Sequence, residues 1–294
     1  MAIKRVGVVG CGLMGSGIAQ ISAEAGYETL VREVNQELLD RGLNKIKGDL
    51  TKLVGKGKIT QEHMDSTMAK IKGTVDLAHL KDCDIIIEAI IEDINEKNRL
   101  FAELNMTCPR DTIFATNTSS LSVTEMAAAS GRPDRVVGLH FFNPAPVMKL
   151  VEVVRAVSTS DETFQRAYEF AKSLGKEPVA CRDNSGFIVN FLLVPYLLDA
   201  VKALEMGVGS VEDIDKSMRL GCGYPMGPFT LLDFVGIDTT YRIANIMYDE
   251  YRLPHYAPPP LLKRMFLMGY HGRKTGKGFY DYSTEPPRVM DLGL

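Results

Sequence analysis

Short apolar runs alternate with longer, partly polar stretches through the first 185 or so residues. The apolar runs have the length of strands and lie at residues 6–9, 28–32, 84–88, 113–115, 136–139 and 151–154. The stretches between them show helical spacing, most clearly at residues 16–25 and 36–54. Since strands that alternate with helices form sheets covered on both faces, we predict an α/β fold with a doubly wound, mostly parallel sheet here.

The pattern changes after Gly186. Residues 187–206 form a long, strongly apolar stretch with helical spacing, and the rest of the chain is helical in pattern with glycine and proline breaks. We therefore predict two domains: residues 1–185 contain the sheet, and residues 186–294 form an all-α domain. The second domain exposes many apolar residues for its size, which predicts pairing with a second copy as a homodimer.

Composition narrows the range of partners. The chain has 294 residues, 45% hydrophobic and 24% charged, which are ordinary values for a globular protein with two cores. A net charge of −3 gives no attraction to nucleic acid, and no apolar run approaches the ~20 residues of a membrane span. We expect neither a nucleic-acid nor a membrane partner. The first strand follows residues 1–5 directly, so we expect no targeting segment.

The five cysteines are odd in number and widely spread, and no pair has the spacing of metal ligands. They are Cys11, Cys83, Cys108, Cys181 and Cys222. The number and spacing of these cysteines predict reduced, mostly structural thiols, no metal site and a cytoplasmic location.

A glycine-rich segment at residues 10–15 follows the first predicted strand and opens the first predicted helix. In that context Gly10 permits the turn, Gly12 lets the backbone approach a pyrophosphate, and Gly15 lets helix and strand pack closely. The helix amino terminus offers free N–H groups and a partial positive charge to phosphates. We predict a Rossmann domain that binds a dinucleotide at Gly10, Gly12, Leu13, Met14 and Gly15.

Glu33 follows the second predicted strand, about 20 residues after the glycine segment. A carboxylate there accepts hydrogen bonds from ribose hydroxyls and repels a 2′-phosphate, which favours NAD over NADP. Two alternatives remain open: Glu33 is an ordinary surface residue, or Arg32 attracts a 2′-phosphate.

His140 and Glu152 form the candidate catalytic pair. Of the five histidines, His140 alone stands at the carboxyl end of a predicted parallel strand, the edge where such sheets bind ligands. A histidine suits proton transfer because its ordinary pKa lies near neutral pH. Glu152, on the neighbouring predicted strand, would bond the second ring nitrogen and orient the base. A purely structural pair and a hydrolytic dyad are the alternatives, although no nucleophile elbow is present.

Five segments of the chain resemble the signatures of the L-3-hydroxyacyl-CoA dehydrogenase family. They are residues 117–122, 140–154, 186–190, 223–228 and 272–280. The resemblance covers essentially the whole chain in order, and its compact length is similar to the 3-hydroxybutyryl-CoA dehydrogenase type. It implies an NAD-dependent oxidoreductase of fatty acid metabolism that interconverts an L-3-hydroxyacyl-CoA and a 3-ketoacyl-CoA, with the substrate held between the two domains.

The resemblance also implies roles for individual residues. His140 matches the family's general base, Glu152 its orienting partner, and Ser119 and Asn190 the residues that hydrogen-bond the reacting oxygens. Neutral donors there stabilise developing charge. Taken alone, Ser119 is read as a helix N-cap and Asn190 as a polar residue in a helix.

Further matches concern the cofactor and coenzyme A. Glu33 matches the ribose-binding acid, Glu92 and Lys97 match ribose and nicotinamide contacts, and Asn143 matches a nicotinamide neighbour. Without the family, Glu92 and Lys97 are simply an exposed helix start. Lys56 matches a position that contacts coenzyme A and lies in a basic stretch, residues 40–58.

Two positions depart from the family pattern. Ser185 stands where the family usually has proline, which loosens the expected interdomain connection, and Phe191 stands where it usually has arginine, which removes a charge near Asn190. Two other functions remain open: a related dehydrogenase of a 3-hydroxy acid without coenzyme A, and a catalytically silent NAD-binding protein.

Overall fold

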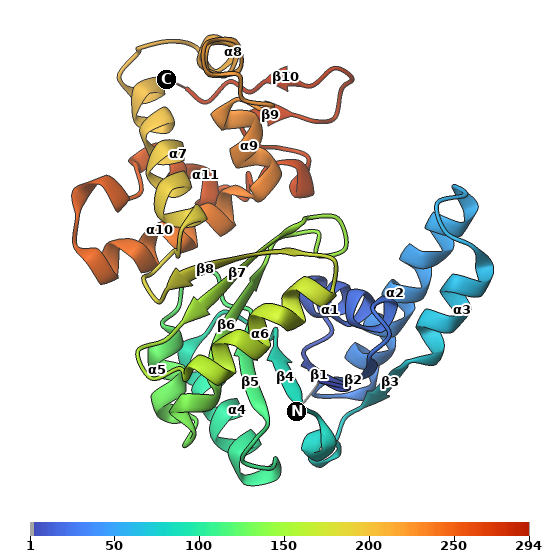
Figure 1. Ribbon diagram of the computed structural model, residues 1–294. Helices are drawn as coiled ribbons and strands as arrows, with labels where there is room; N and C mark the ends of the chain where they lie inside the picture. The colour runs from blue at the N-terminus through green and yellow to red at the C-terminus, as the bar shows by residue number, and fades with distance from the viewer. Residues whose placement is uncertain (1–2, 294) are drawn as a thin grey trace. The chain divides into compact units, whose positions relative to one another are not determined.

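The computed structural model describes residues 3–293 and forms two compact units, Met1–Phe187 and Ile188–Leu294. The first unit contains an eight-stranded sheet in the order β3-β2-β1-β4-β5-β6-β7-β8 (Figure 1). Its strands are β1 (Arg5–Val9), β2 (Glu28–Arg32), β3 (Ile71–Thr74), β4 (Ile85–Glu88), β5 (Ile113–Thr116), β6 (Val136–Phe141), β7 (Leu150–Arg155) and β8 (Glu177–Arg182).

The first six strands are parallel, in the order of a dinucleotide-binding sheet. β7 then runs antiparallel to β6, and β8 runs parallel to β7. The predicted doubly wound, mostly parallel sheet is therefore confirmed. The reversal at β7 also places its first residues beside the carboxyl end of β6.

Apolar side chains that alternate along the strands form two buried clusters, one on each face of the sheet. Val6 and Val8 of β1 belong to one hydrophobic cluster, and Val9 belongs to another. In β4, Ile85 belongs to the first cluster and Ile86 to the second. Side chains of successive strand residues point to opposite faces, so each cluster covers one face of the sheet.

The helices of the first unit pack over these two faces. They are α1 (Leu13–Glu24), α2 (Gln36–Gly55), α3 (Gln61–Ala69), α4 (Ile94–Thr107), α5 (Val123–Ala129) and α6 (Asp161–Ser173), with short 3₁₀ turns η1 (Leu77–Asp82) and η2 (Pro133–Arg135). Side chains of α1, α2 and α6 enter the first cluster, and side chains of α4 and α5 enter the second. Asn35, Thr60 and Ser122 are among the short polar residues that cap these helices.

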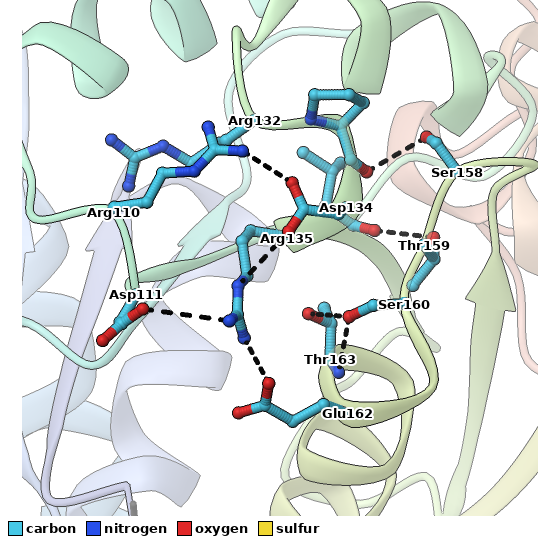
Figure 2. A network of polar contacts seen from close by, with 12 residues as sticks. Arg110, Asp111, Arg132, Asp134, Arg135, Ser158, Thr159, Ser160, Glu162 and Thr163 are labelled. Carbon is cyan, nitrogen blue, oxygen red and sulfur yellow. Dashed lines mark hydrogen bonds and ion pairs between the residues drawn. The ribbon is translucent and has the colours of Figure 1, made fainter.

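A polar network ties the segment before β6 to the start of α6 (Figure 2). Asp134 of η2 pairs with Arg110 at 2.8 Å, and Arg135 pairs with Glu162 of α6 at 3.0 Å. The Ser160 backbone N–H donates to the Asp134 carbonyl oxygen at 3.1 Å. Partly exposed ion pairs of this kind contribute little stability each, so we assign this network a local role at the start of α6.

The second unit is a helical layer with its own core. Its helices are α7 (Val189–Glu205), α8 (Val211–Cys222), α9 (Pro228–Val235), α10 (Ile237–Tyr251) and α11 (Pro260–Leu267), with 3₁₀ turns η3 (Pro254–Tyr256) and η4 (Arg273–Thr275). A small antiparallel pair, β9 (Tyr280–Asp281) and β10 (Arg288–Val289), completes it. The helical second domain is confirmed, and this hairpin is an addition to it.

The first helix of the second unit begins later than its apolar pattern indicates. Phe187 has a positive φ of 51° and packs in the first unit, with its ring 5.6 Å from that of His140. The helix α7 starts only at Val189. The backbone at Phe187 is left-handed and cannot continue a right-handed helix, so the prediction of a helix from residue 187 is wrong by two residues.

No helix within residues 3–293 has the length and apolar character needed to cross a membrane. The same residues contain no group of three or more His, Cys, Asp or Glu side chains arranged to hold a metal ion.

Candidate active site

The glycine loop connects β1 to α1 at the carboxyl edge of the sheet. Gly10 has a φ of +93°, and its N–H donates to the Arg32 carbonyl oxygen at 2.9 Å. A Cβ on Gly15 would lie 1.8 Å from the Gly10 carbonyl oxygen, so helix and loop meet backbone to backbone. A Cβ on Gly12, in contrast, would have no atom within 4 Å. Leu13 and Met14 form the first turn of α1.

Glu33 lies beside this loop. One carboxylate oxygen accepts from the Cys11 N–H at 2.6 Å, and the other accepts from the Val34 N–H at 3.0 Å. Burial, together with the charge of Glu33, raises the pKa of the Cys11 thiol to about 12. Cys11 is therefore a neutral, space-filling side chain, and a Cβ on Gly42 of α2 would lie 2.2 Å from its Sγ.

These features fit a dinucleotide. The N-cap of α1 is Gly12, no side chain of the described residues caps it, and its first turn contains no acidic residue. The N–H groups of that turn are therefore available to a phosphate, and the space at Gly12 lets a ligand approach the backbone. Glu33 places a carboxylate at the end of β2, where a ribose hydroxyl donor would be accepted.

His140 and Glu152 are directly paired across β6 and β7. They occupy opposite positions in the antiparallel register, and His140 Nδ1 lies 2.7 Å from Glu152 Oε2. Both side chains are buried, at 6% and 1% exposure. The ring of Phe142 lies 4.4 Å from the His140 ring. A carboxylate that accepts from Nδ1–H leaves Nε2 as the proton-accepting nitrogen, and Nε2 has no hydrogen-bond partner within residues 3–293.

Ser119 lies in the loop between β5 and α5, near the same edge. Its N–H donates to Glu92 Oε1 at 3.0 Å, and its hydroxyl lies 3.4 Å from the same oxygen. The structure contradicts its interpretation as a helix N-cap, because Ser122 caps α5 through the Glu125 N–H. The cap lies three residues further on because residues 117–121 first cross from the end of β5 to the helix.

Glu92 and Lys97 adjoin this loop but differ in burial. Glu92 is exposed, whereas the Lys97 side chain is only 1% exposed and pairs with Glu88 at 2.6 Å and with Glu92 at 3.2 Å. The view that both residues form an exposed helix start is therefore wrong for Lys97. Its ammonium turns inward because Glu88, at the end of a buried strand, supplies a carboxylate there.

Two residues that shape the loops around His140 went unassigned in the sequence. The Asn117 side chain accepts from the Phe141 N–H at 2.9 Å and so links the ends of β5 and β6. The buried Lys176 ammonium donates to the carbonyl oxygens of Ala145 and Met148, at 2.5 and 2.9 Å. Asn117 belongs to a segment already singled out, but nothing in the sequence distinguishes Lys176 from surface lysines. The exposed Asn143 begins the loop that Lys176 holds.

The remaining candidates lie on other elements of the chain. Lys56 is the exposed C-cap of α2, and Asn190 is the second residue of α7 in the second unit. Ser185 donates its hydroxyl to the Ser120 carbonyl oxygen at 2.9 Å, which ties this position to the loop between β5 and α5. Phe191 packs against other rings of the second unit, 5.7 Å from Tyr251.

A parallel sheet in this order, with a glycine loop before α1 and a buried histidine–glutamate pair at the same edge, defines a dinucleotide-dependent oxidoreductase. Comparison with known proteins agrees. Residues 5–184 match the model of the 3-hydroxyacyl-CoA dehydrogenase NAD binding domain, and residues 186–282 match that of the 3-hydroxyacyl-CoA dehydrogenase C-terminal domain. The chain belongs to the 3-hydroxyacyl-CoA dehydrogenase family and is an NAD-dependent oxidoreductase.

Individual relatives resemble the chain over nearly its full length. The chain is 49% identical over 284 residues to the 3-hydroxybutyryl-CoA dehydrogenase of Mycobacterium tuberculosis, covering 96% of this chain and 99% of that protein. It is 45% identical to human mitochondrial hydroxyacyl-coenzyme A dehydrogenase, covering 95% and 91% of the two chains. The crystal structure of M. tuberculosis FadB2 superposes with a TM-score of 0.94 at 48% identity, covering 96% of this chain and 100% of that one.

Proposed function

We propose that the protein interconverts an L-3-hydroxyacyl-CoA and its 3-ketoacyl-CoA, with His140 as the general base. The observation that carries the proposal is the 2.7 Å contact between His140 Nδ1 and Glu152 Oε2 in a buried setting. In the oxidative direction, Nε2 of His140 takes the proton of the 3-hydroxyl group. Glu152 keeps the ring oriented and stabilises the imidazolium that forms. NAD, when bound, accepts the hydride from C3.

The other site residues bind and orient. Ser119 and Asn190 are proposed to donate hydrogen bonds to the reacting oxygens of the substrate, where neutral donors stabilise developing charge. Gly10, Gly12, Leu13, Met14 and Gly15 would hold the pyrophosphate of NAD. Glu33, Glu92, Lys97 and Asn143 would serve its riboses and nicotinamide.

The acyl group and the coenzyme A portion of the proposed substrate are inferred from different observations. Because several relatives are named 3-hydroxybutyryl-CoA dehydrogenase, we propose 3-hydroxybutyryl-CoA as the first substrate to test. Lys56 is the proposed contact for coenzyme A phosphates. It is exposed and makes no ion pair within residues 3–293, whereas nearby Lys45 and Lys52 both pair with Asp49.

We further propose that residues 1–185 act as the NAD-binding domain and residues 186–294 as the substrate-binding and dimerising domain. A homodimer is supported by the apolar side chains that the second unit exposes, among them Leu192 and Leu220. A cytoplasmic location is supported by the five free cysteines, none of which forms a disulfide.

Replacement of His140 by glutamine tests the central role. We expect turnover of acetoacetyl-CoA, followed by NADH absorbance, to fall by about 10²- to 10⁴-fold, while the calorimetric dissociation constant for NAD stays unchanged. The contrasting variant is Glu33→Ala, which should weaken NAD binding more than acyl-CoA binding.

Three outcomes would contradict parts of the proposal. Near-normal turnover in His140→Gln would refute the base. Activity of the native protein on free 3-keto acids but not on the thioester would favour the dehydrogenase without coenzyme A. No NADH oxidation with any substrate, together with intact NAD binding, would favour the catalytically silent protein.

A further inference from the structure

A buried acid–base pair lies where β4 ends, next to the proposed site. Glu88 is 0% exposed and Lys97 is 1% exposed, and the ammonium lies 2.6 Å from Glu88 Oε1. Glu88 Oε1 also accepts from the Ile90 N–H at 2.8 Å, and Oε2 accepts from the Thr116 hydroxyl at 2.7 Å. Buried charges persist only when they are paired and hydrogen-bonded, and these three donors fix the orientation of the Glu88 carboxylate.

Lys97 connects this carboxylate to Glu92. Its ammonium lies 3.2 Å from Glu92 Oε2. The other oxygen of Glu92, Oε1, accepts from the Thr118 hydroxyl at 2.5 Å and from the Ser119 N–H at 3.0 Å. A continuous series of contacts therefore runs from Glu88 through Lys97 and Glu92 to the Ser119 loop.

The charges along this series favour one distribution. The Lys97 ammonium lies between the carboxylates of Glu88 and Glu92. The Glu88 carboxylate is the buried one of the two. The positive charge of Lys97 balances the buried Glu88 carboxylate, so the net negative charge of the three residues lies on Glu92, which is exposed. A carboxylate at that position accepts hydrogen bonds from hydroxyl donors such as those of a ribose.

We propose that Glu88 is a positioning residue of the dehydrogenase, acting on Glu92 through Lys97. This inference rests on the proposed roles of Glu92 and Ser119. Lys97 then serves the cofactor through Glu92 rather than by direct contact of its ammonium, which is consistent with the burial of that side chain. Glu88 touches neither substrate nor cofactor and sets where the Glu92 carboxylate lies.

A double-mutant cycle on the full chain tests the route. The variants are Glu88→Gln, Lys97→Met and the two combined, and the measurement is the calorimetric dissociation constant for NAD without acyl-CoA. We expect each single change to weaken NAD binding about tenfold and the double change to weaken it about tenfold as well, because Glu88 has no route to Glu92 without Lys97.

Stability provides a second readout that separates positioning from mere packing. Lys97→Met leaves Glu88 buried without its cation, so the melting temperature should fall, and the double variant should recover much of that loss. Cofactor affinity should not recover with it. If NAD affinity rises together with stability in the double variant, the role is structural and the proposal is overturned.

Two further variants keep the test decisive. Thr116→Val removes one hydrogen bond from Glu88 and should weaken NAD binding in the same direction but less; this variant carries the test if Glu88→Gln does not fold. Glu125→Gln is the matched control. Glu125, in α5, accepts a hydrogen bond from Asn98, which follows Lys97 in α4, but Glu125 lies outside the series of contacts from Glu88 to the Ser119 loop. Its NAD affinity should be unchanged.

The outcomes against the proposal are explicit. A Glu88→Gln variant that binds NAD within about twofold of the native protein, or a double variant weakened about 100-fold by two independent losses, would overturn it. Because cofactor affinity is read without turnover, these results stay interpretable even if His140 is not the base.

Discussion

The three glycines of the loop before α1 stand in different steric surroundings. Gly10 has a positive φ of 93°, and a Cβ on it would lie 2.6 Å from the Ala89 carbonyl oxygen. A Cβ on Gly15 would meet the Gly10 carbonyl oxygen at 1.8 Å. Gly12 has an ordinary φ of −72° and open space around it. Gly10 and Gly15 are therefore required by the fold itself, whereas the fold places no steric demand of this kind on Gly12.

Replacement of Gly12 by alanine should separate binding from folding. We expect an unchanged melting temperature, and NAD binding weakened by about tenfold or more, or 1.4 kcal/mol, because the methyl group occupies the approach of the pyrophosphate. Gly48→Ala is the control: it lies in α2 with no atom within 4 Å of the added Cβ and should leave NAD affinity unchanged. Native affinity in Gly12→Ala would show that the pyrophosphate does not approach this backbone.

The sequence predicted the surroundings of some site residues but not of others. The contact between His140 and Glu152 could be predicted because both lie on short apolar strands that are neighbours in the sequence. The burial of Lys97 could not, because its neighbours in the sequence, Asn95, Glu96, Asn98 and Arg99, are all polar and indicate an exposed turn. The carboxylate that draws it inward belongs to Glu88, on a different element, and only the tertiary fold brings the two together.

At the scale of elements, one glycine-rich segment serves packing rather than catalysis. Residues 272–280 close over Asp233 of α9, which is 1% exposed and accepts from the N–H groups of Phe279 and Tyr280 at 2.9 and 3.0 Å. The Tyr282 hydroxyl donates to the same carboxylate at 3.0 Å. A Cβ on Gly278 would lie 2.0 Å from Asp233 Oδ1, so glycine there permits the backbone to reach the carboxylate.

This arrangement predicts a pH-dependent stability. Burial raises the pKa of Asp233 to about 6, above the ~3.9 of an unfolded aspartate, although its hydrogen bonds act in the opposite direction. The folded state therefore holds this proton more tightly, so the contribution is fully present below about pH 4 and is lost as the pH rises through 6. The loss amounts to about 3 kcal/mol at most.

Urea unfolding of the native protein and of Asp233→Asn, between pH 4 and 8, checks this expectation. The variant does not titrate at this position, so the difference in unfolding free energy between the two proteins should shift in favour of the variant as the pH rises from 4 to 6. Above pH 6 the difference should be constant. A difference that does not change with pH would show that Asp233 titrates alike in the folded and unfolded states.

The strands that could be predicted from the sequence were those with several buried apolar residues. The strands β1, β2 and β4 were predicted within one residue at each end, because each contains a short group of valine, isoleucine or leucine residues. β3 and β8 were missed, since most of their residues are exposed or only partly buried and give no apolar run. The helix α3 was missed as well, having only Met64 and Thr67 buried.

At the scale of the whole molecule, the apolar surface is unevenly distributed. More than half of the large apolar side chains exposed within residues 3–293 belong to the second unit, which holds about a third of the chain. Tyr196 of α7 makes an edge contact with Tyr224, at 5.7 Å between ring centroids. Leu192 lies one turn before Tyr196, and Leu220 lies four residues before Tyr224. We call these four residues the α7–α8 patch.

A charge within the α7–α8 patch should prevent dimerisation. Leu192 and Leu220 are 67% and 74% exposed, so aspartate at either position is hydrated in a monomer but must be desolvated between two subunits. We expect sedimentation velocity to give a dimer for the native protein and a monomer for Leu192→Asp or Leu220→Asp, with an unchanged helical circular dichroism signal. Met106→Asp, in α4 of the first unit and 86% exposed in the native protein, should remain dimeric. A native protein that sediments as a monomer, or patch variants that stay dimeric, would mean that a second copy of the chain does not cover this surface.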